Sequence, residues 1–322
     1  MNKIKTAIIG AAGYTGGELI RLLIHHPGCE LVYIHSNSQK GKKLEEVHPD
    51  LLGESDLVFT DEVQVEGIDA VFLGLPHGQT QPFLDQHSFS DQTVIIDLST
   101  DFRDESNGFI YGLPETNKNA ILKAKKIANP GCFATTIQLA LAPAIAEGIV
   151  QSTIHVTGIT GSTGAGKKWS DPTHFSQRNQ NISVYKLFNH QHLKEITQSF
   201  KFLDPGFNQE MLFIPYRGNF SRGIWITAYF PYEGTEEEAY ALYENFYREA
   251  AFTLVSRNDI DLKQVVNTNK CILHLKKEAG QLVIYSVLDN LLKGASGQAV
   301  QNFNLAFGLS EKEGLNLKSI VF

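Results

Sequence analysis

Residues 5–16 read Lys5-Thr6-Ala7-Ile8-Ile9-Gly10-Ala11-Ala12-Gly13-Tyr14-Thr15-Gly16. The run up to Ile9 has the apolar character of a short buried strand, and leucines at helical spacing follow the turn until Pro27-Gly28. Glycines let the backbone of such a turn approach a pyrophosphate closely, and the start of the helix adds N–H groups and a positive dipole end. We therefore predict a dinucleotide-binding turn; a tight turn that only packs the helix on the strand is the alternative. The expected cofactor contacts are Gly10, Ala12, Gly13, Tyr14, Thr15 and Gly16.

The pattern of elements changes after about residue 130. Before that point, apolar runs at residues 31–34, 68–75 and 93–98 are bounded by turn residues, which predicts a parallel sheet with helical crossovers. Beyond it, residues 224–230 alternate in polarity, and two strand-like runs flank Glu278-Ala279-Gly280 as a hairpin. We therefore expect an α/β protein, with a Rossmann-type parallel-sheet nucleotide domain and an α+β domain that contains a mainly antiparallel sheet.

The composition excludes several classes of protein. The chain has 322 residues, 42% of them hydrophobic and 20% charged, which is ordinary for a soluble protein of two domains. A net charge of −7 without a basic run argues against a nucleic-acid surface. No apolar stretch could span a bilayer and no signal peptide precedes the first strand, so we expect a cytoplasmic protein. Three distant cysteines indicate neither a disulfide framework nor a metal site, and no metal is expected.

The end of the second predicted strand bears on the identity of the nucleotide. An NAD enzyme usually has an acidic residue here that binds the ribose 2′-hydroxyl, but no acid occurs before Glu45. Hydroxyls at Ser36 and Ser38, followed by three lysines, suit a 2′-phosphate instead. We therefore expect NADP(H), although a solvated loop would account for any single lysine. The three lysines are Lys40, Lys42 and Lys43.

The segment Asn129-Pro130-Gly131-Cys132 is followed by an apolar run of helical character. Pro-Gly forces a turn, so Cys132 falls at the start of the helix, where the dipole stabilises a thiolate. A thiolate is the attacking species in covalent acyl transfer. Cys29 and Cys271 lack this setting and are interpreted as small core residues, which is also the alternative for Cys132.

The ordered motifs resemble those of one family. The Cys132 segment is similar to the active-site motif of N-acetyl-gamma-glutamyl-phosphate reductases, which are relatives of aspartate-semialdehyde dehydrogenase. The resemblance extends over nearly the whole chain and includes the glycine turn. Its other motifs are residues 73–78, 96–103, 111–115, 161–166, 218–224 and 289–302.

The resemblance implies a domain layout and a set of further site residues. Residues 1–130 and 293–322 would form the NADP-binding Rossmann domain, and residues 131–292 the catalytic, substrate and oligomerisation domain. The family also implies a homodimer or homotetramer. Further cofactor contacts are implied for Pro76, His77, Ser99, Gly164 and Asn302, and substrate contacts for Arg103, Asn129 and Arg222.

The histidine motif departs from the family pattern. Relatives carry His-Arg-His-x-Pro-Glu, whereas residues 190–195 read His-Gln-His-Leu-Lys-Glu. His190 and His192 are the candidate acid or base, because imidazole titrates near neutral pH. Residues two apart on a helix do not face one way, so we expect only one, His190 by preference, to point at Cys132. Arg217 follows Pro215-Tyr216 where relatives often have Pro-His, which suggests that a substrate-binding cation has moved from position 191 to position 217.

The resemblance implies NADPH-dependent reduction of N-acetyl-gamma-glutamyl phosphate to the 5-semialdehyde and inorganic phosphate, through a thioester on Cys132, in arginine biosynthesis. The same chemistry on an N-succinyl-glutamyl, aminoadipyl or aspartyl phosphate is the first alternative. Acetyl and succinyl differ by a carboxylate that Arg217 could bind. A catalytically silent dinucleotide-binding regulator is the second alternative, and the intact cysteine and histidines argue against it.

Overall fold

The computed structural model describes residues 3–320 and separates into two compact units. The first unit extends to Pro130 and includes Ala295–Asn316; the second is Gly131–Gly294 together with the chain from Leu317. Of the residues 293–322 that the family resemblance assigns to the nucleotide domain, Ala295–Asn316 lie in the first unit, whereas residues 317–320 lie in the second. One contact that holds them there is a 3.2 Å hydrogen bond from Asn267 Nδ2 to the carbonyl oxygen of Lys318.

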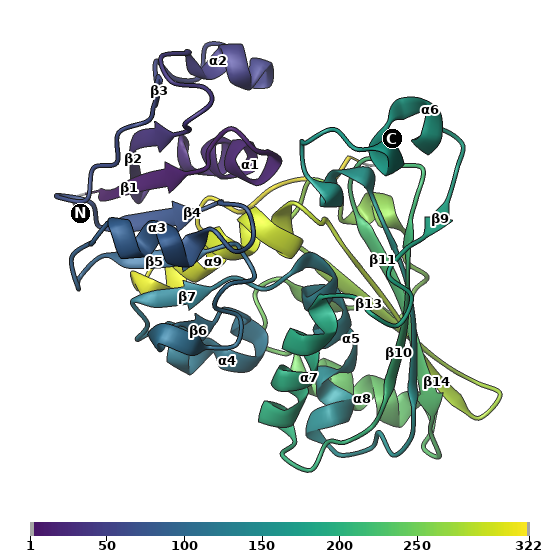
Figure 1. Cartoon of the computed structure of the whole chain (residues 1–322). Coiled ribbons are helices and arrows are strands. Elements are labelled where there is room, and N and C mark those ends of the chain that lie inside the picture. Colours follow the sequence, from purple (N-terminus) through teal and green to yellow (C-terminus); the bar gives the residue numbers. More distant parts are fainter. Residues whose placement is uncertain (1–2, 321–322) are drawn as a thin grey trace. The chain divides into compact units, whose positions relative to one another are not determined.

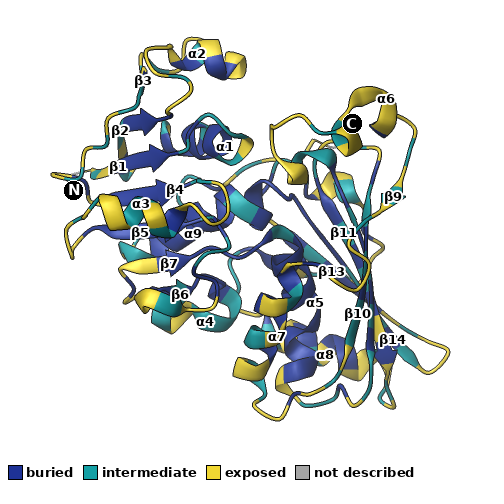
Figure 2. Cartoon of the chain, in the orientation of Figure 1, coloured by how far each residue is buried: buried dark blue, intermediate teal, exposed yellow. Residues whose placement is uncertain are grey.

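The first unit is built on a seven-stranded sheet in which every pairing is parallel, in the order β3-β2-β1-β4-β5-β7-β6. The inner strands β1 and β4 are buried at their apolar residues, as expected for a sheet with both faces covered (Figure 2). The strands are Ile4–Ile9 (β1), Cys29–His35 (β2), Phe59–Thr60 (β3), Ala70–Leu73 (β4), Val94–Asp97 (β5), Ile110–Tyr111 (β6) and Lys126–Ala128 (β7). The helices are Tyr14–Leu23 (α1), Leu44–Val47 (α2), Thr80–Gln86 (α3), Pro114–Ile121 (α4) and Gly297–Ala306 (α9).

The second unit contains a mixed sheet in the order β12-β13-β14-β11-β8-β10-β9, with α5 and α8 packed against it and α7 packed on α5 (Figure 1). The strands are Ile154–Thr160 (β8), Ser183–Val184 (β9), Met211–Arg217 (β10), Ile224–Pro231 (β11), Thr253–Val255 (β12), Cys271–Glu278 (β13) and Gln281–Leu288 (β14). The helices are Cys132–Ala146 (α5), Phe175–Arg178 (α6), His192–Leu203 (α7) and Glu236–Phe246 (α8). Short 3-10 turns occupy Pro49–Leu51, Ser106–Gly108, Ser162–Ala165, Asp171–Thr173 and Leu262–Gln264, and a π-helical turn occupies Leu292–Ser296.

The predicted hairpin and alternating strand are confirmed. β13 and β14 pair antiparallel around Ala279 and Gly280, whose φ angles of +48° and +75° suit a two-residue hairpin turn. Along β11, residues buried under the helices alternate with residues of higher exposure. The expected fold, a parallel nucleotide domain and a second domain with a mainly antiparallel sheet, is therefore correct. No helix within residues 3–320 is both long and apolar enough to cross a membrane.

Candidate active site

The glycine turn joins β1 to α1, and its glycines meet different steric demands. Gly10 has a φ of +79°, and a Cβ there would lie 2.4 Å from the carbonyl oxygen of Gly74. A Cβ at Gly16 would lie 2.5 Å from the carbonyl oxygen of Ala11. At Gly13, the N-cap of α1, a Cβ would meet nothing closer than the Gly10 oxygen at 3.8 Å. The protein's own packing thus requires two of the glycines, whereas Gly13 leaves open the space through which a pyrophosphate could approach the helix.

The start of α1 suits an anion electrostatically. Its first turn has no acidic residue, and its glycine N-cap offers no side-chain hydrogen bond. Buried His48, which the sequence analysis did not consider, is hydrogen bonded through Nε2 to the Ala11 carbonyl oxygen at 2.9 Å. The Ser296 hydroxyl donates to the carbonyl oxygen of Thr15 at 2.9 Å, so the turn is held on two sides. The remaining predicted contact residues of the turn, all partly or fully exposed, are Ala12, Tyr14 and Thr15.

The loop after β2 holds the residues predicted to contact the ribose phosphate. Ser36 is buried, and its hydroxyl lies 3.4 Å from that of Ser38. Lys40 forms a 2.9 Å ion pair with Asp61, which directly follows β3, the neighbour of β2 in the sheet. One of the three cations is therefore neutralised by an acid that is distant in sequence. The other two, Lys42 and Lys43, have exposed side chains.

Two carboxylates tie together the loops that follow β4 and β5. Fully buried Asp97 accepts hydrogen bonds from Thr80 Oγ1 at 2.9 Å and from Ser99 Oγ at 2.7 Å. Burial raises the pKa of Asp97 above its usual value. Asp101 accepts hydrogen bonds from the N–H groups of Gly78 and Thr80 at 2.6 and 2.9 Å. These contacts position the predicted cofactor-contact residues of the two loops, Pro76, His77 and Ser99.

Arg103, Asn129 and Asn302 belong to a buried polar network in the first unit. Asn302 Nδ2 donates to the Gly112 carbonyl oxygen at 2.9 Å and to Asn129 Oδ1 at 3.2 Å. Asn129 Nδ2 donates to the Ala295 carbonyl oxygen at 3.0 Å. Arg103 is 6% exposed, and its Nε donates to the Asn129 carbonyl oxygen at 3.0 Å. These nitrogen atoms are therefore engaged in fixing the chain that leads to Pro130.

Cys132 is the first residue of α5, and Gly131 is its N-cap. The cysteine is partly exposed, whereas Cys29 and Cys271 are buried. Burial raises the pKa of Cys29 to about 11, so that thiol stays protonated, while a helix start favours a thiolate. A Cβ on Gly294 would lie 2.8 Å from the Cβ of Cys132, so the π-helical turn packs its backbone directly against this cysteine.

The two predicted histidines lie together in the second unit. Each is 6% exposed, and their ring centroids are 4.6 Å apart. His190 Nδ1 accepts a 3.2 Å hydrogen bond from the backbone N–H of His192. The expected divergence along a helix does not apply, because His190 precedes α7 and only His192 belongs to it. Phe133, the neighbour of Cys132, meets the His190 ring edge-on with centroids 5.5 Å apart, which places the imidazole beside the start of α5.

Glu195 joins the histidines to the start of α5. Its Oε2 accepts a 3.1 Å hydrogen bond from the N–H of Gly131, and its Oε1 lies 3.9 Å from His192 Nε2. The carboxylate is buried, with 6% of the residue exposed. No local sequence pattern assigns a role to Glu195, because its partner is 64 residues away in the chain.

Burial, with a smaller effect from the Lys186 charge, lowers the pKa of His190 to about 4. The ring is therefore neutral near pH 7, and since Nδ1 is an acceptor, the hydrogen-bond pattern assigns the proton to Nε2. The Tyr185 ring lies 5.7 Å from that of His190. Burial raises the pKa of Tyr185, and the negative charge of a Cys132 thiolate raises it further. Two side chains near the start of α5, those of His190 and Tyr185, are therefore neutral at pH 7.

Arg222 forms a bidentate ion pair. Its Nε and Nη2 donate to the two carboxylate oxygens of Asp289 at 3.0 and 3.2 Å. The same carboxylate accepts the backbone N–H groups of Asn267 and Leu291, both at 2.8 Å or less. The Arg222 guanidinium is therefore held by a carboxylate at the start of the chain that leads into the π-helical turn, and Gly294 of that turn packs against Cys132.

Gly164 lies in a loop of the second unit, within the 3-10 turn Ser162–Ala165. A Cβ there would lie 3.3 Å from Thr160 Oγ1. Asn290 Nδ2 donates to Thr163 Oγ1 at 3.0 Å, and Asn290 Oδ1 accepts the N–H of Gly223 at 2.7 Å. The loop is thus fixed to the strand that precedes it and to the chain before the π-helical turn.

Arg217 ends β10, and its guanidinium carbon lies 4.8 Å from the centre of the Tyr185 ring. Both residues line a cavity of about 630 Å³ in the second unit. Arg217 is thus linked to the histidine pair through the Tyr185 ring.

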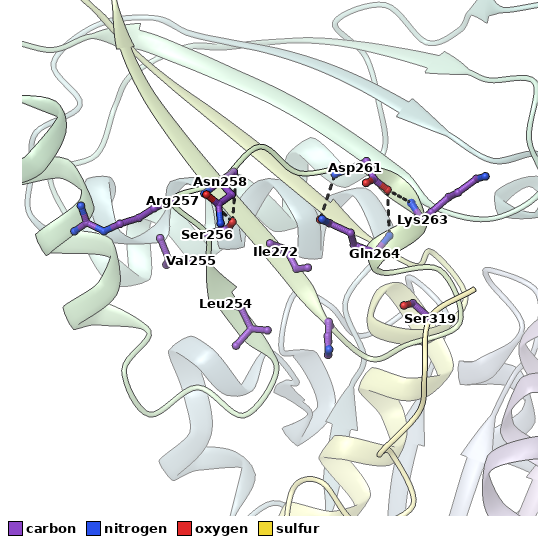
Figure 3. Close-up of a pocket in the computed structure, with 11 residues that line it drawn as sticks. Leu254, Val255, Ser256, Arg257, Asn258, Asp261, Lys263, Gln264, Ile272 and Ser319 are labelled. Atoms are coloured by element: carbon purple, nitrogen blue, oxygen red, sulfur yellow. Dashed lines mark hydrogen bonds between the residues drawn. The ribbon is translucent and has the colours of Figure 1, made fainter. Parts of the chain in front are cut away.

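A second cavity, of about 780 Å³, lies at the β12 edge of the second sheet (Figure 3). Arg257, Asp261 and Lys263 are among its lining residues, but its lining contains no cysteine or histidine. It therefore lacks the chemistry of the Cys132 cluster. Within residues 3–320, no group of three His, Cys, Asp or Glu side chains could hold a metal ion.

Two family models match the chain. The one described as "Semialdehyde dehydrogenase, NAD binding domain" matches residues 5–124, and the one described as "Semialdehyde dehydrogenase, dimerisation domain" matches residues 132–290. Together they account for most of both compact units.

Curated relatives and solved structures agree with this match. The chain is 53% identical to the N-acetyl-gamma-glutamyl-phosphate reductase of Azobacteroides pseudotrichonymphae genomovar. CFP2, over 99% of this chain and 100% of that one. It is 54% identical to the protein of the same name from Christiangramia forsetii, with the same coverage. The fold is similar to that of aspartate semialdehyde dehydrogenase II from Vibrio cholerae, with a TM-score of 0.77, 16% identity, and coverage of 96% of this chain and 99% of that one.

Proposed function

The chain belongs to the semialdehyde dehydrogenase family, and from this premise we propose that it is an N-acetyl-gamma-glutamyl-phosphate reductase of arginine biosynthesis. The reaction would convert the acyl phosphate to N-acetylglutamate 5-semialdehyde and inorganic phosphate, with NADPH as reductant. The observation that carries the proposal is the setting of Cys132, a partly exposed cysteine at the start of a buried helix, beside two histidines.

Cys132 acts as the nucleophile. Its thiolate sulfur forms a bond to the acyl carbon while the bond from that carbon to the phosphate oxygen breaks, which leaves a thioester and inorganic phosphate. After reduction of the acyl carbon, the sulfur–carbon bond breaks, the carbonyl of the aldehyde forms, and the sulfur returns as a thiolate. The helix start favours the negative charge on sulfur in the first and last states.

His190 supplies a hydrogen bond to the substrate oxygen. Its imidazole is neutral and carries its proton on Nε2, so it can donate to the oxygen that becomes negative when the carbonyl is attacked or reduced. Glu195 orients the second imidazole, that of His192, and holds the Gly131 N–H, so the start of α5 keeps its position through the reaction. We assign His192 and Glu195 positioning roles.

The first unit would hold the nucleotide. The open approach at Gly13, the acid-free start of α1 and the hydroxyls of Ser36 and Ser38 fit a pyrophosphate and a phosphorylated ribose. When bound, NADPH supplies the hydride that reduces the acyl carbon. His77 and Ser99, in loops tied by buried hydrogen bonds, would line the same nucleotide.

The proposal extends to assembly and location. The residues of β11 that alternate with the buried ones include Tyr229, which is 38% exposed and stacks on His155 of β8. We propose that this side of the second sheet contacts another copy in a homodimer or homotetramer, in keeping with the name of the matching domain. A cytoplasmic location would keep Cys132 reduced.

The test is direct detection of the thioester. Enzyme mixed with the acyl phosphate in the absence of NADPH should gain the mass of one acyl group on Cys132, measured by mass spectrometry of the intact protein and its peptides. Cys271→Ser, which alters a buried cysteine of the same unit, should keep the adduct, and Cys132→Ser should lose it. An adduct that persists in Cys132→Ser, or no adduct in the wild type, would contradict the proposal.

A further inference from the structure

We propose that Arg178 and Arg217 form a carboxylate-binding subsite for the substrate within the second unit. The proposal rests on the acyl-phosphate reductase function proposed above and adds to it a specific binding group. Arg178 was not a candidate in the sequence analysis, because the segment around it carries no recognisable motif.

Strand pairing brings the two arginines together. In the register of β9 and β10, Arg217 is the direct partner of Ser183. The Ser183 hydroxyl accepts a 3.1 Å hydrogen bond from Arg178 Nη1. Arg178 is the last residue of α6, and it is buried whereas the other residues of this short helix are exposed (Figure 2). Ser183 therefore links the two arginines: Arg178 bonds to its hydroxyl, and Arg217 is its partner in the neighbouring strand.

Both guanidinium groups have buried donors without a partner in the protein. Arg178 is 6% exposed, and its Nε and Nη2 are buried and make no hydrogen bond with any described residue. Nε of Arg217 is likewise buried and makes no hydrogen bond with any described residue. Among residues 3–320, no carboxylate forms an ion pair with either arginine. Asp171 and Arg217 both line the cavity of about 630 Å³ described above. Asp171 is exposed and forms no ion pair with Arg217 or Arg178. Burial lowers the pKa of Arg178, and the charge of Arg217 lowers it further.

Two adjacent positive charges with unpaired buried N–H groups are costly unless an anion joins them. A guanidinium presents parallel N–H donors that match the two oxygens of a carboxylate. The adjoining cavity of about 630 Å³ is lined by Trp169, Tyr185 and Arg217 among others, and would admit an acyl amino acid rather than a single ion. The fit is therefore to a carboxylate on an organic chain.

The subsite adjoins the proposed nucleophile within the same unit. The Arg217 guanidinium lies over the Tyr185 ring, which in turn contacts the ring of His190. Tyr185 also lies close enough to Cys132 for a thiolate charge to affect it. A substrate whose carbonyl is at Cys132 can therefore place a carboxylate near the arginines. An N-acylglutamyl phosphate offers its α-carboxylate, and an N-succinyl group would offer a second carboxylate.

The experiment compares Arg178→Gln and Arg217→Gln with the wild type in phosphate-dependent oxidation of N-acetylglutamate 5-semialdehyde and of its N-succinyl counterpart. We expect KM for the semialdehyde to rise about 10- to 100-fold, because a charge-assisted hydrogen bond is lost. Arg178→Lys, which keeps the charge without the planar fork, should lose less. Arg248→Gln, at an exposed arginine of the same unit, should match the wild type. Because Arg178 is buried, its variants are checked for their melting temperature, and half-buried Arg217 provides the independent substitution.

The pattern of loss identifies the source of the carboxylate. A loss confined to the N-succinyl substrate supports the subsite and assigns it to the N-acyl carboxylate. An equal loss on both substrates supports the subsite and assigns it to the α-carboxylate. Unchanged KM for both semialdehydes, or a rise only in KM for phosphate, would overturn the proposal.

Titration calorimetry with unreactive N-acylglutamates measures binding at the subsite without catalysis. It therefore distinguishes failure of the subsite proposal from failure of the proposed reductase function. N-acetylglutamate and N-succinylglutamate carry the carboxylates but no reactive phosphate. At least one of them should bind the wild type, and bind Arg217→Gln about 10-fold or more weakly. Such binding in a protein that forms no thioester would leave the subsite standing and refute the reductase function. Equal binding by wild type and variant, in a protein that forms the thioester, would refute the subsite alone.

Discussion

The N-termini of α1 and α5 both favour a nearby negative charge, but the anion is different at each. Both helices begin at a glycine N-cap without a side-chain hydrogen bond, and neither has an acidic residue in its first turn. At α1, Gly13 leaves space for an anion that comes from outside. At α5, the anion is part of the chain, because Cys132 is the first helical residue. The helix N-terminus therefore favours an anion at both sites. The side chain beside it determines whether the site binds an anionic ligand or carries a nucleophile that attacks the substrate.

The surroundings of the two helix starts differ as well. The turn before α1 is held largely by backbone contacts and by His48. The turn before α5 is held by a buried carboxylate, Glu195, and is packed against the backbone at Gly294. A ligand site must let its ligand enter and leave, whereas a covalent nucleophile must keep one position through several steps.

The largest expected effect comes from Cys132→Ser. It should lower kcat by about 1000-fold or more, because a hydroxyl is far less readily ionised than a thiol, while NADPH affinity stays near the wild-type value. Steady-state kinetics and fluorescence titration with NADPH would measure the two quantities. A parallel loss of nucleotide affinity would show that the two helix starts do not function independently.

The second effect is the pH dependence of stability that buried His190, beside the start of α5, contributes. The pKa of His190 is about 4 in the folded protein and about 6.5 in an unfolded chain. As pH falls below the unfolded value, only the unfolded state gains the proton, so stability is lost between about pH 6.5 and pH 4 and then levels off. The shift corresponds to about 3 kcal/mol.

Denaturant unfolding at several pH values would test this contribution. The wild type should lose about 3 kcal/mol more than His190→Asn between pH 7 and pH 4. His155→Asn, in the same unit, serves as the control for replacement of a histidine as such. If His190→Asn lost as much stability as the wild type over this range, the buried neutral imidazole would be the wrong description.

The third effect separates the glycines of the α1 turn. Gly16→Ala should destabilise the protein by about 1–3 kcal/mol, because its Cβ would meet the Ala11 backbone at 2.5 Å. Gly13→Ala should change stability by less than about 1 kcal/mol, since its Cβ enters open space. It should instead weaken NADPH binding by about 10-fold or more, because the methyl group occupies the approach of the pyrophosphate.

Thermal unfolding and NADPH titration of both variants would measure these effects. Thioester formation by Gly13→Ala should remain at the wild-type level, since Cys132 is unaffected. If Gly13→Ala bound NADPH as tightly as the wild type, the space at Gly13 would have no role in nucleotide binding.

Features that depend on neighbours in sequence could be predicted. A few consecutive residues predict the glycine turn, the position of Cys132 at a helix start and the Ala279-Gly280 hairpin. The class of both sheets also follows from local sequence patterns. The family resemblance supplied the histidine pair. Short strands could not be predicted, because β3, β6 and β9 have two residues each and no detectable period.

Features that depend on contacts across the fold could not be predicted. The ion pair between Lys40 and Asp61 could not be predicted, because it depends on the pairing of β3 with β2. The ion pair between Arg222 and buried Asp289 could not be predicted, because its partners are 67 residues apart in the chain. Arg178 becomes a candidate only once β9 and β10 are paired. In each case the partner is set by strand order rather than by the local sequence.

The smallest expected effect concerns the carboxylate that distinguishes α5 from α1. Glu195→Gln retains an oxygen acceptor for the Gly131 N–H but removes the charge that strengthens this bond and faces His192. We expect a loss of about 1 kcal/mol in unfolding free energy, and a fall in kcat of no more than about 10-fold with KM for NADPH unchanged. Glu249→Gln, at an exposed acid of the same unit, is the matched control. A kcat loss as large as that of Cys132→Ser, in a protein of unchanged stability, would show that Glu195 takes part in proton transfer rather than holding the helix start.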